Sequence, residues 1–171
     1  RQYGIYFQSS ANATINYNRL IGADNGRWKR AINNTASNQF AQVNYNYIEV
    51  LSMESGDVDQ YGIVVNDSEV IGDSIFIYVN SHYTSEGSGI IANRSTIQEN
   101  YIRMEDYSSP NYHHTGDSEG IYSMGDGDSR HTISNNIIES TGRGIWASYA
   151  DIENNHLSNW SDNNNDEWAI G

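Results

Sequence analysis

A short phrase of residues recurs along this chain. Each copy begins with a small residue and an isoleucine, reaches an aliphatic residue some positions later, then Asn or Asp three positions on, and ends on an apolar residue two positions after that. The clearest copy is Gly89-Ile90, Ile97, Asn100 and Ile102. The other copies begin at Gly4, Ala31, Gly62, Gly120 and Gly144, and a seventh begins at Ala169. Successive copies start about 24 to 31 residues apart, which is the period of a solenoid whose units bury their apolar faces only against their neighbours.

The composition and the local pattern favour strands joined by tight turns. Leu and Ala, which favour helices, are scarce beside Ile, Val and Tyr, and apolar residues alternate with polar ones over short runs. The Ile-x-x-Asn-x-Ile spacing places an apolar residue inward, turns the chain at or beside the Asn, and returns an apolar residue inward. Asn tolerates the left-handed conformation of such a turn, and its amide can bond to the equivalent Asn of the next coil.

This repeat resembles the right-handed parallel β-helix of the pectin-lyase-like superfamily over residues 4–170. The resemblance implies an all-β solenoid of about six coils, with three parallel strands per coil and an Asn ladder at the turn between the second and third strands. The ladder would consist of Asn18, Asn46, Asp73, Asn100, Asn136 and Asn155. An ionised Asp73 could not donate to a neighbouring amide, so the ladder is expected to be weakest there. We expect one domain over residues 1–171, as a segment of a longer protein.

Charge and hydropathy limit the classes of partner that this chain is expected to bind. Its net charge of −13 includes only nine Lys and Arg residues, which argues against binding to nucleic acid. No apolar run approaches the roughly 18 residues of a membrane span, so no membrane insertion is expected. We expect an extracellular, cell-surface or virion-attached protein that binds a polysaccharide or other glycan. Its open ends would pair with neighbouring coils or chains, which allows homo-oligomers.

Aromatic residues mark a predicted glycan-binding face. In enzymes of the superfamily the substrate groove lies along the outer face of the first strands. Outward positions are expected there at the glycine of each phrase, and at Tyr6, Asn33, Val64, Ile91, Tyr122 and Trp146. Tyr and Trp rings stack on the apolar faces of sugars, so Tyr6, Tyr122 and Trp146 are predicted to bind substrate. The alternative is that these rings only cover their neighbours.

Ionisable residues cluster around the first strand of the fifth coil. The candidate catalytic residues are Asp117, Glu119, Asp126, Asp128 and His131, and the candidate substrate-binding residues beside them are His113 and Arg130. Paired carboxylates can act as general acid and base on a glycosidic bond. Asp126 and Asp128 could instead ligate Ca²⁺, and no other cofactor is indicated. The alternative is ordinary turn chemistry in Gly125-Asp126-Gly127-Asp128 and a solvated loop at His113-His114.

Two classes of function therefore remain open. The first is a structural or glycan-binding segment of an extracellular solenoid, such as an adhesin or a phage tailspike shaft. The second is a polysaccharide-degrading enzyme of the superfamily, either a glycoside hydrolase or a lyase. The first is favoured because about six coils barely frame a groove, whereas the superfamily's enzymes generally have more coils and a cap. The few basic residues favour a neutral glycan, or an acidic one bridged by Ca²⁺.

Overall fold

The computed structural model describes residues 3–7, 12–22, 30–34, 40–52, 60–79, 87–106, 119–127, 131–140 and 143–159. Every regular element within these ranges is a β-strand. In this part of the chain no helix is long and apolar enough to cross a membrane. The described chain is therefore all-β, as the sequence predicts.

The strands form three parallel sheets of six strands each in the described ranges. The first sheet contains β1 (Tyr3–Tyr6), β4 (Arg30–Asn33), β7 (Gln60–Asn66), β10 (Gly87–Asn93), β13 (Glu119–Met124) and β16 (Arg143–Ser148). The second contains β2 (Ala13–Asn16), β5 (Ala41–Asn44), β8 (Glu69–Ile71), β11 (Thr96–Gln98), β14 (His131–Ser134) and β17 (Ala150–Glu153). The third contains β3 (Arg19–Gly22), β6 (Tyr47–Ser52), β9 (Ser74–Val79), β12 (Tyr101–Asp106), β15 (Ile137–Ser140) and β18 (His156–Asn159). Each coil contributes one strand to each sheet, which is the arrangement of a parallel β-solenoid.

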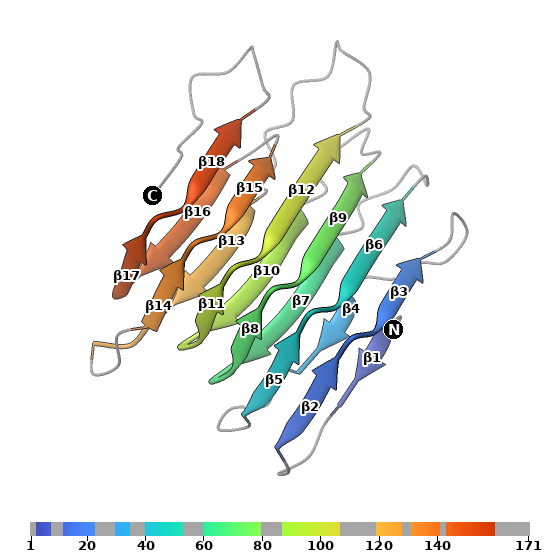
Figure 1. Ribbon diagram of the computed structural model, residues 1–171, viewed down its shortest axis with the longest axis horizontal. Coiled ribbons are helices and arrows are strands. Elements are labelled where there is room, and N and C mark those ends of the chain that lie inside the picture. Colours follow the sequence, from blue (N-terminus) through green and yellow to red (C-terminus); the bar gives the residue numbers. More distant parts are fainter. Residues whose placement is uncertain are drawn as a thin grey trace.

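Figure 1 shows the hand of the coil. The second and third sheets lie in the near layer, where the chain runs up the picture, and the first sheet lies in the far layer, where it runs down. Successive coils advance from right to left. A path that rises in front, descends behind and advances leftwards is a right-handed coil. The predicted right-handed β-helix is therefore confirmed.

Apolar residues fill the interior in three stacks, one for each sheet. The fully buried members are Ile32, Ile63, Ile90, Ile121 and Ile145 in the first sheet, Val43, Val70, Ile97 and Ile133 in the second, and Ile48, Ile75, Ile102 and Ile138 in the third. A shift of one residue would turn every member of a stack outward. The register predicted from the repeated phrase is thus confirmed.

The glycines before the isoleucines of the first sheet face the interior. A Cβ atom on Gly120 would lie 2.3 Å from Cγ2 of Ile138 and 2.7 Å from the carbonyl oxygen of Gly144. Gly62 and Gly89 are equally crowded, with closest approaches of 2.5 and 2.4 Å. The absent side chain therefore allows the strand to approach the inner isoleucine of the third sheet. The expectation that these glycines lie on the outer face is wrong.

The predicted Asn ladder is present at the turn between the second and third strands. Asn18, Asn46, Asn100 and Asn136 each donate two hydrogen bonds, from the backbone N–H and from Nδ2, to Oδ1 of the ladder residue in the next coil. These bonds are 2.6 to 3.0 Å long. The ladder therefore ties each turn to the next one through a row of side-chain amide groups, with the carboxyl group of Asp73 at one position.

The residue before each ladder position has the left-handed backbone, and the ladder residue itself does not. The φ angles are 59° at Tyr17, 57° at Tyr45, 70° at Gly72, 58° at Glu99, 57° at Asn135 and 53° at Asn154. The tolerance of Asn for this conformation is therefore not what places Asn in the ladder. Its amide is retained for the bonds between coils, and the preceding residue makes the turn.

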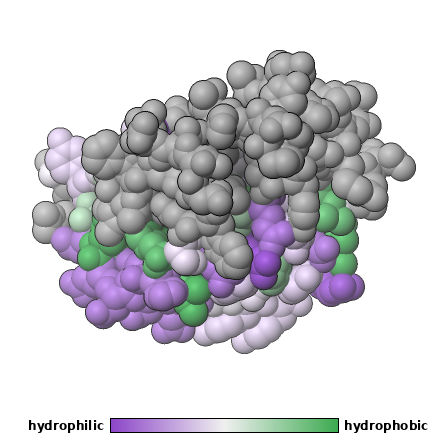
Figure 2. All heavy atoms as spheres, turned by 90° about the horizontal axis from the view of Figure 1, so that it is seen from above, coloured by the Kyte–Doolittle hydropathy of each residue, from purple (hydrophilic) through white to green (hydrophobic). Residues whose placement is uncertain are grey.

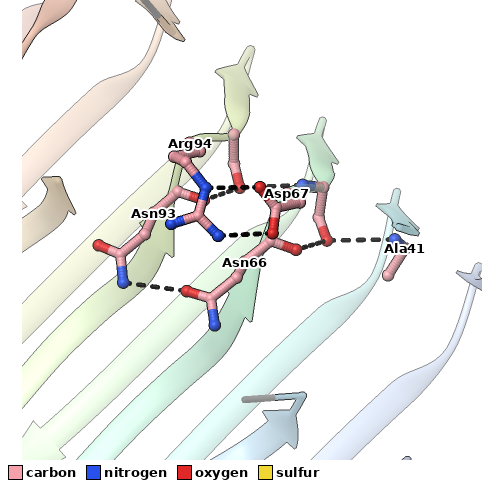
Figure 3. Close-up of polar contacts among 7 residues, drawn as sticks. Ala41, Asn66, Asp67, Asn93 and Arg94 are labelled. Carbon is pink, nitrogen blue, oxygen red and sulfur yellow. Dashed lines mark hydrogen bonds and ion pairs between the residues drawn. The ribbon is translucent and has the colours of Figure 1, made fainter. Parts of the chain in front are cut away.

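A second polar ladder lies at the turn between the first and second strands (Figure 3). Asn93 Nδ2 donates to Asn66 Oδ1 over 2.9 Å. The guanidinium group of Arg94 donates two bonds of 2.6 Å to the carboxylate of Asp67. Asp67 and Arg94 both have left-handed backbones, with φ of 50° and 51°. These contacts join the coils of β7 and β10, and the repeated phrase does not include the residues that make them.

Candidate functional site

The outer face of the first sheet carries two rows of side chains. One row consists of Tyr3, Arg30, Tyr61, Ser88, Glu119 and Arg143. The other consists of Tyr6, Asn33, Val64, Ile91, Tyr122 and Trp146. The rows contact each other: the rings of Tyr3 and Tyr6 stack 4.8 Å apart, and Arg30 Nη1 donates to Asn33 Oδ1 over 2.7 Å. The chemistry of this face therefore changes from coil to coil.

Four of these side chains form one cluster on β13 and β16. The rings of Tyr122 and Trp146 lie edge to face with their centroids 5.9 Å apart. The guanidinium carbon of Arg143 lies 4.2 Å from the centroid of the Trp146 ring, within the range of a cation–π interaction. Arg143 Nη1 also lies 3.5 Å from Glu119 Oε1. We call Glu119, Tyr122, Arg143 and Trp146 the β13–β16 cluster.

Glu119 positions the cluster. Glu119 is only 5% exposed, and its Oε2 accepts a hydrogen bond of 3.0 Å from Ser88 Oγ. A buried carboxylate is stable only when it is paired and hydrogen-bonded, and Ser88 and Arg143 provide both kinds of contact. The pairing holds Arg143 beside the Trp146 ring. Glu119 is therefore better placed to orient neighbouring groups than to take a proton from a ligand.

Asp126 lies away from this cluster. β13 is six residues long, so Glu119 at its start and Asp126 beyond its end are separated by at least about 16 Å of strand. Asp126 is exposed and interacts electrostatically with Arg94, at the turn shown in Figure 3. The hydrogen bonding of Arg94 to the carboxylate of Asp67 is the main cause that raises the pKa of Arg94, and the charge of Asp126 adds to it. Glu119 and Asp126 therefore cannot form the closely paired carboxylates of a glycosidase.

His131 lies inside the coil. It follows Ser68 and Ser95 in the stack at the first turn, and its Nε2 lies 2.7 Å from the Oγ of Ser123. Because Ser123 Oγ donates to the carbonyl oxygen of Ala92 over 2.5 Å, His131 Nε2 must carry the proton that it shares with Ser123. Burial lowers the pKa of His131, and the charge of Asp151 opposes this shift.

The contact between Ser123 and His131 has the spacing of a nucleophile and its base, yet it is closed to ligands. Ser123 is 0% exposed and His131 is 5% exposed. The nucleophile of an acyl-transfer enzyme must reach its substrate, and Ser123 does not reach the surface. We therefore place His131 in the core and leave it out of the candidate site.

The other residues of the predicted site lie away from the cluster or outside the described ranges. Tyr6 is on β1, and β4, β7 and β10 separate it from β13, so about 19 Å lies between Tyr6 and Tyr122. His113, Asp117, Asp128 and Arg130 lie outside the described residues. In the described part of the chain no group of three or more His, Asp or Glu residues is arranged to hold a metal ion.

The sequence predictions missed an aromatic strip on the outer face of the third sheet. Phe76 lies between two tyrosines, with ring centroids 5.3 Å from Tyr47 and 5.6 Å from Tyr101. The hydroxyl of Tyr47 donates to Glu49 Oε2 and that of Tyr101 to Glu139 Oε2, both over 3.0 Å. The sequence does contain a signal for this strip, because Tyr47 and Tyr101 each follow a ladder residue directly. These contacts between coils stabilise the sheet, and the hydroxyl groups are already occupied.

Figure 2 shows the hydropathy of the described residues on one side of the molecule. Among the coloured residues in Figure 2, hydrophobic ones appear only as small patches separated by hydrophilic and intermediate ones. Large contiguous apolar patches mark protein or membrane contacts, and this view shows none among the described residues. An aromatic pair with polar neighbours is instead the usual lining of a site for a polar ligand.

Comparison of the chain with family models, with curated proteins and with solved structures found no match. The chain forms a right-handed parallel β-solenoid with an Asn ladder.

Proposed function

We propose that this chain is an extracellular β-solenoid segment, of a cell-surface or virion-attached protein, that binds a glycan through the β13–β16 cluster. The observation that carries the proposal is the edge-to-face pair of Tyr122 and Trp146 on adjacent strands, with Arg143 held against the Trp146 ring. Such rings contact the apolar face of a sugar while their polar edges stay hydrated. The resemblance to the pectin-lyase-like superfamily supports the same side of the coil, where its enzymes bind substrate.

Charge supports a neutral glycan as the ligand. The chain carries a net charge of −13, which repels polyanions. Arg143, the cation that the structure describes within the cluster, already lies beside Glu119. A uronate would therefore have to displace this carboxylate, whereas the hydroxyl groups of a neutral sugar can bond to both side chains without a change in charge.

The polysaccharide-degrading alternative has less support. Its acid and base would have to lie close together on the outer face. Among the candidates that the structure describes, Glu119 is at the start of β13, Asp126 lies beyond its end, and His131 is in the interior. We therefore propose binding without turnover. A sensitive assay for new reducing ends, on the glycans that bind, tests this part of the proposal directly.

The replacement of Trp146 by Ala is the decisive test. The wild-type protein and Trp146→Ala would be compared on a panel of neutral oligosaccharides by calorimetry or glycan array. We expect the variant to lose at least about tenfold in affinity, because an aromatic ring at the centre of a contact supplies a large share of its energy. The fold should be retained, since the Trp146 ring lies outside the core.

Tyr6→Ala is the matched control. Tyr6 belongs to the same outer row and is 45% exposed, but it lies about 19 Å from Tyr122. We expect Tyr6→Ala to bind the oligosaccharides of the panel with the same affinity as the wild type. Equal affinity of the wild type and Trp146→Ala for every bound glycan would overturn the proposed site.

A further inference from the structure

One position of the Asn ladder holds a carboxyl group in place of an amide. Asp73 Oδ1 accepts hydrogen bonds from the backbone N–H and the Nδ2 of Asn46, over 2.6 and 2.8 Å. The N–H of Asp73 donates in turn to Asn100 Oδ1 over 2.9 Å. Asp73 is 1% exposed. It therefore fills every role of a ladder residue except that of the side-chain donor.

At the other interior positions of the ladder, the Nδ2 group of the Asn side chain donates two hydrogen bonds. Asn136 Nδ2, for example, donates to Asn155 Oδ1 in the next coil over 2.9 Å and to the carbonyl oxygen of Ile97 in the preceding coil over 3.1 Å. Asn100 repeats both bonds, with Asn136 Oδ1 and with the carbonyl oxygen of Val70. An amide nitrogen in the ladder thus stands between two oxygen acceptors.

Asp73 Oδ2 occupies the place of this nitrogen. By the same register its two neighbours are Asn100 Oδ1 and the carbonyl oxygen of Val43, and both are acceptors. Asp73 Oδ2 is buried and has no hydrogen-bond partner. An ionised Oδ2 would add charge repulsion to the cost of an unsatisfied buried oxygen. A protonated Oδ2 would instead donate to one of the two acceptors.

No charged group beside Asp73 in the described interior compensates for its ionisation. The described titratable side chains on the neighbouring turns and strands are Tyr45, Tyr47, Glu49, Glu69, Tyr78, Glu99, Tyr101, Arg103 and Glu105. All of them belong to the outer surface: Tyr45 and Glu99 are exposed, and the others interact along the outer faces of their sheets. Burial is the main cause that raises the pKa of Asp73 to about 7, against the opposing hydrogen bonds from Asn46.

We propose that Asp73 is a buried proton-binding site, and that its neutral carboxylic acid donates the ladder hydrogen bond that an amide donates in the other coils. Loss of this proton leaves two acceptors facing a carboxylate in the middle of the solenoid. The turn from β8 to β9 then loosens, and pH controls the cohesion of the coils on either side of it.

The direction of the effect follows from linkage. The pKa of Asp73 rises from 3.8 to about 7 in the folded chain, so the folded state holds a proton that the unfolded state releases. The contribution of Asp73 to the free energy of unfolding is therefore greatest near and below pH 3.8, and it falls as the pH rises toward 7. Above that pH the contribution is lost.

The test compares the wild type with Asp73→Asn and with Glu99→Gln in urea unfolding from about pH 5 to about pH 9. Asp73→Asn supplies the amide permanently, and Glu99→Gln removes one exposed carboxylate from the neighbouring turn as a charge-matched control. Below pH 7 the folded-to-unfolded ratio of the wild type should fall, relative to Asp73→Asn, by up to about tenfold per pH unit. Glu99→Gln should follow the wild type. Other groups, including the buried His131, contribute equally to the wild type and Asp73→Asn and cancel in the ratio.

A ratio that stays constant over this range would overturn the proposal. A second measurement on the wild type covers the case in which Asp73→Asn does not fold. Carbon-13 NMR of the Asp side-chain carboxyl groups should show one that stays protonated well above the usual range of Asp. If every Asp carboxyl titrates in that usual range, Asp73 is ionised in the fold and the proposal fails.

Discussion

Single residues set how closely neighbouring coils approach. Gly120 stands against Ile138, and its backbone lies where any side chain would meet both the isoleucine and the next strand. Tyr17, Tyr45 and Glu99 accept a left-handed backbone that such residues rarely adopt. The solenoid tolerates this cost because the adjacent ladder residue is hydrogen-bonded to the neighbouring coil.

Gly120→Ala should destabilise the fold by at least about 1 to 3 kcal/mol, since the added methyl group overpacks a site bounded by backbone and core atoms. Urea unfolding measures the loss. Gly127→Ala is the control, because nothing lies within 4 Å of a Cβ atom at that glycine. If the two variants were equally stable, the crowding at Gly120 would not limit the approach of the coils.

At this scale the sequence predicts some positions and hides others. The Asn ladder could be predicted because the same chemistry recurs at a fixed offset from the buried isoleucines. The left-handed residues could not, because Tyr17, Gly72 and Glu99 share a backbone conformation but no side-chain chemistry. The placement of His131 was also hidden, since it occupies an interior position that Ser68 and Ser95 fill in other coils.

At the scale of the strands, the sequence pattern predicts which side chains face inward. The alternation of apolar and polar residues predicted the three inner stacks, because burial fixes which face of a strand turns inward. It did not predict which outer side chains meet. The pairing of Arg143 with Glu119 and Trp146 depends on contacts between rows, and the aromatic strip of the third sheet depends on contacts between coils.

Ile97→Ala tests the stacks at the scale of one strand. Ile97 is fully buried on β11 between Val70 and Ile133, so its truncation should cost about 2 to 5 kcal/mol through lost transfer energy and a cavity. Ile137→Ala on β15 is the matched control, because that residue is 44% exposed and should change stability by less than about 0.5 kcal/mol. Chemical denaturation of both variants gives the comparison, and similar losses would show that the inner stacks do not dominate stability.

The whole molecule is a row of coils in which each pairs only with its neighbours. β1, β2 and β3 pair on one side only within the described sheets, and so do β16, β17 and β18. Strand edges of this kind invite pairing with other chains. We propose that these outer coils are covered by further coils or by other copies of the chain.

This proposal predicts concentration-dependent association of the chain in isolation. Static light scattering at micromolar concentration should show species larger than the monomer. Ile152→Lys would place a charge at the outermost coil of the second stack and should shift the population toward monomer. A wild-type chain that stays monomeric at every concentration would contradict the prediction.

The ladder gives such assemblies a polarity. The bonds between ladder residues all run one way: each is donated to the Oδ1 atom of the next coil toward the C-terminus, from Asn18 to Asn155. Within the described residues one end of the row therefore presents an amide oxygen at Asn18, and the other presents amide hydrogens at Asn155. Two like ends brought together would set acceptor against acceptor or donor against donor, whereas unlike ends complete the row. We therefore expect stacking of these chains to run head to tail, and such a heterologous contact would continue as a filament because it does not close on itself.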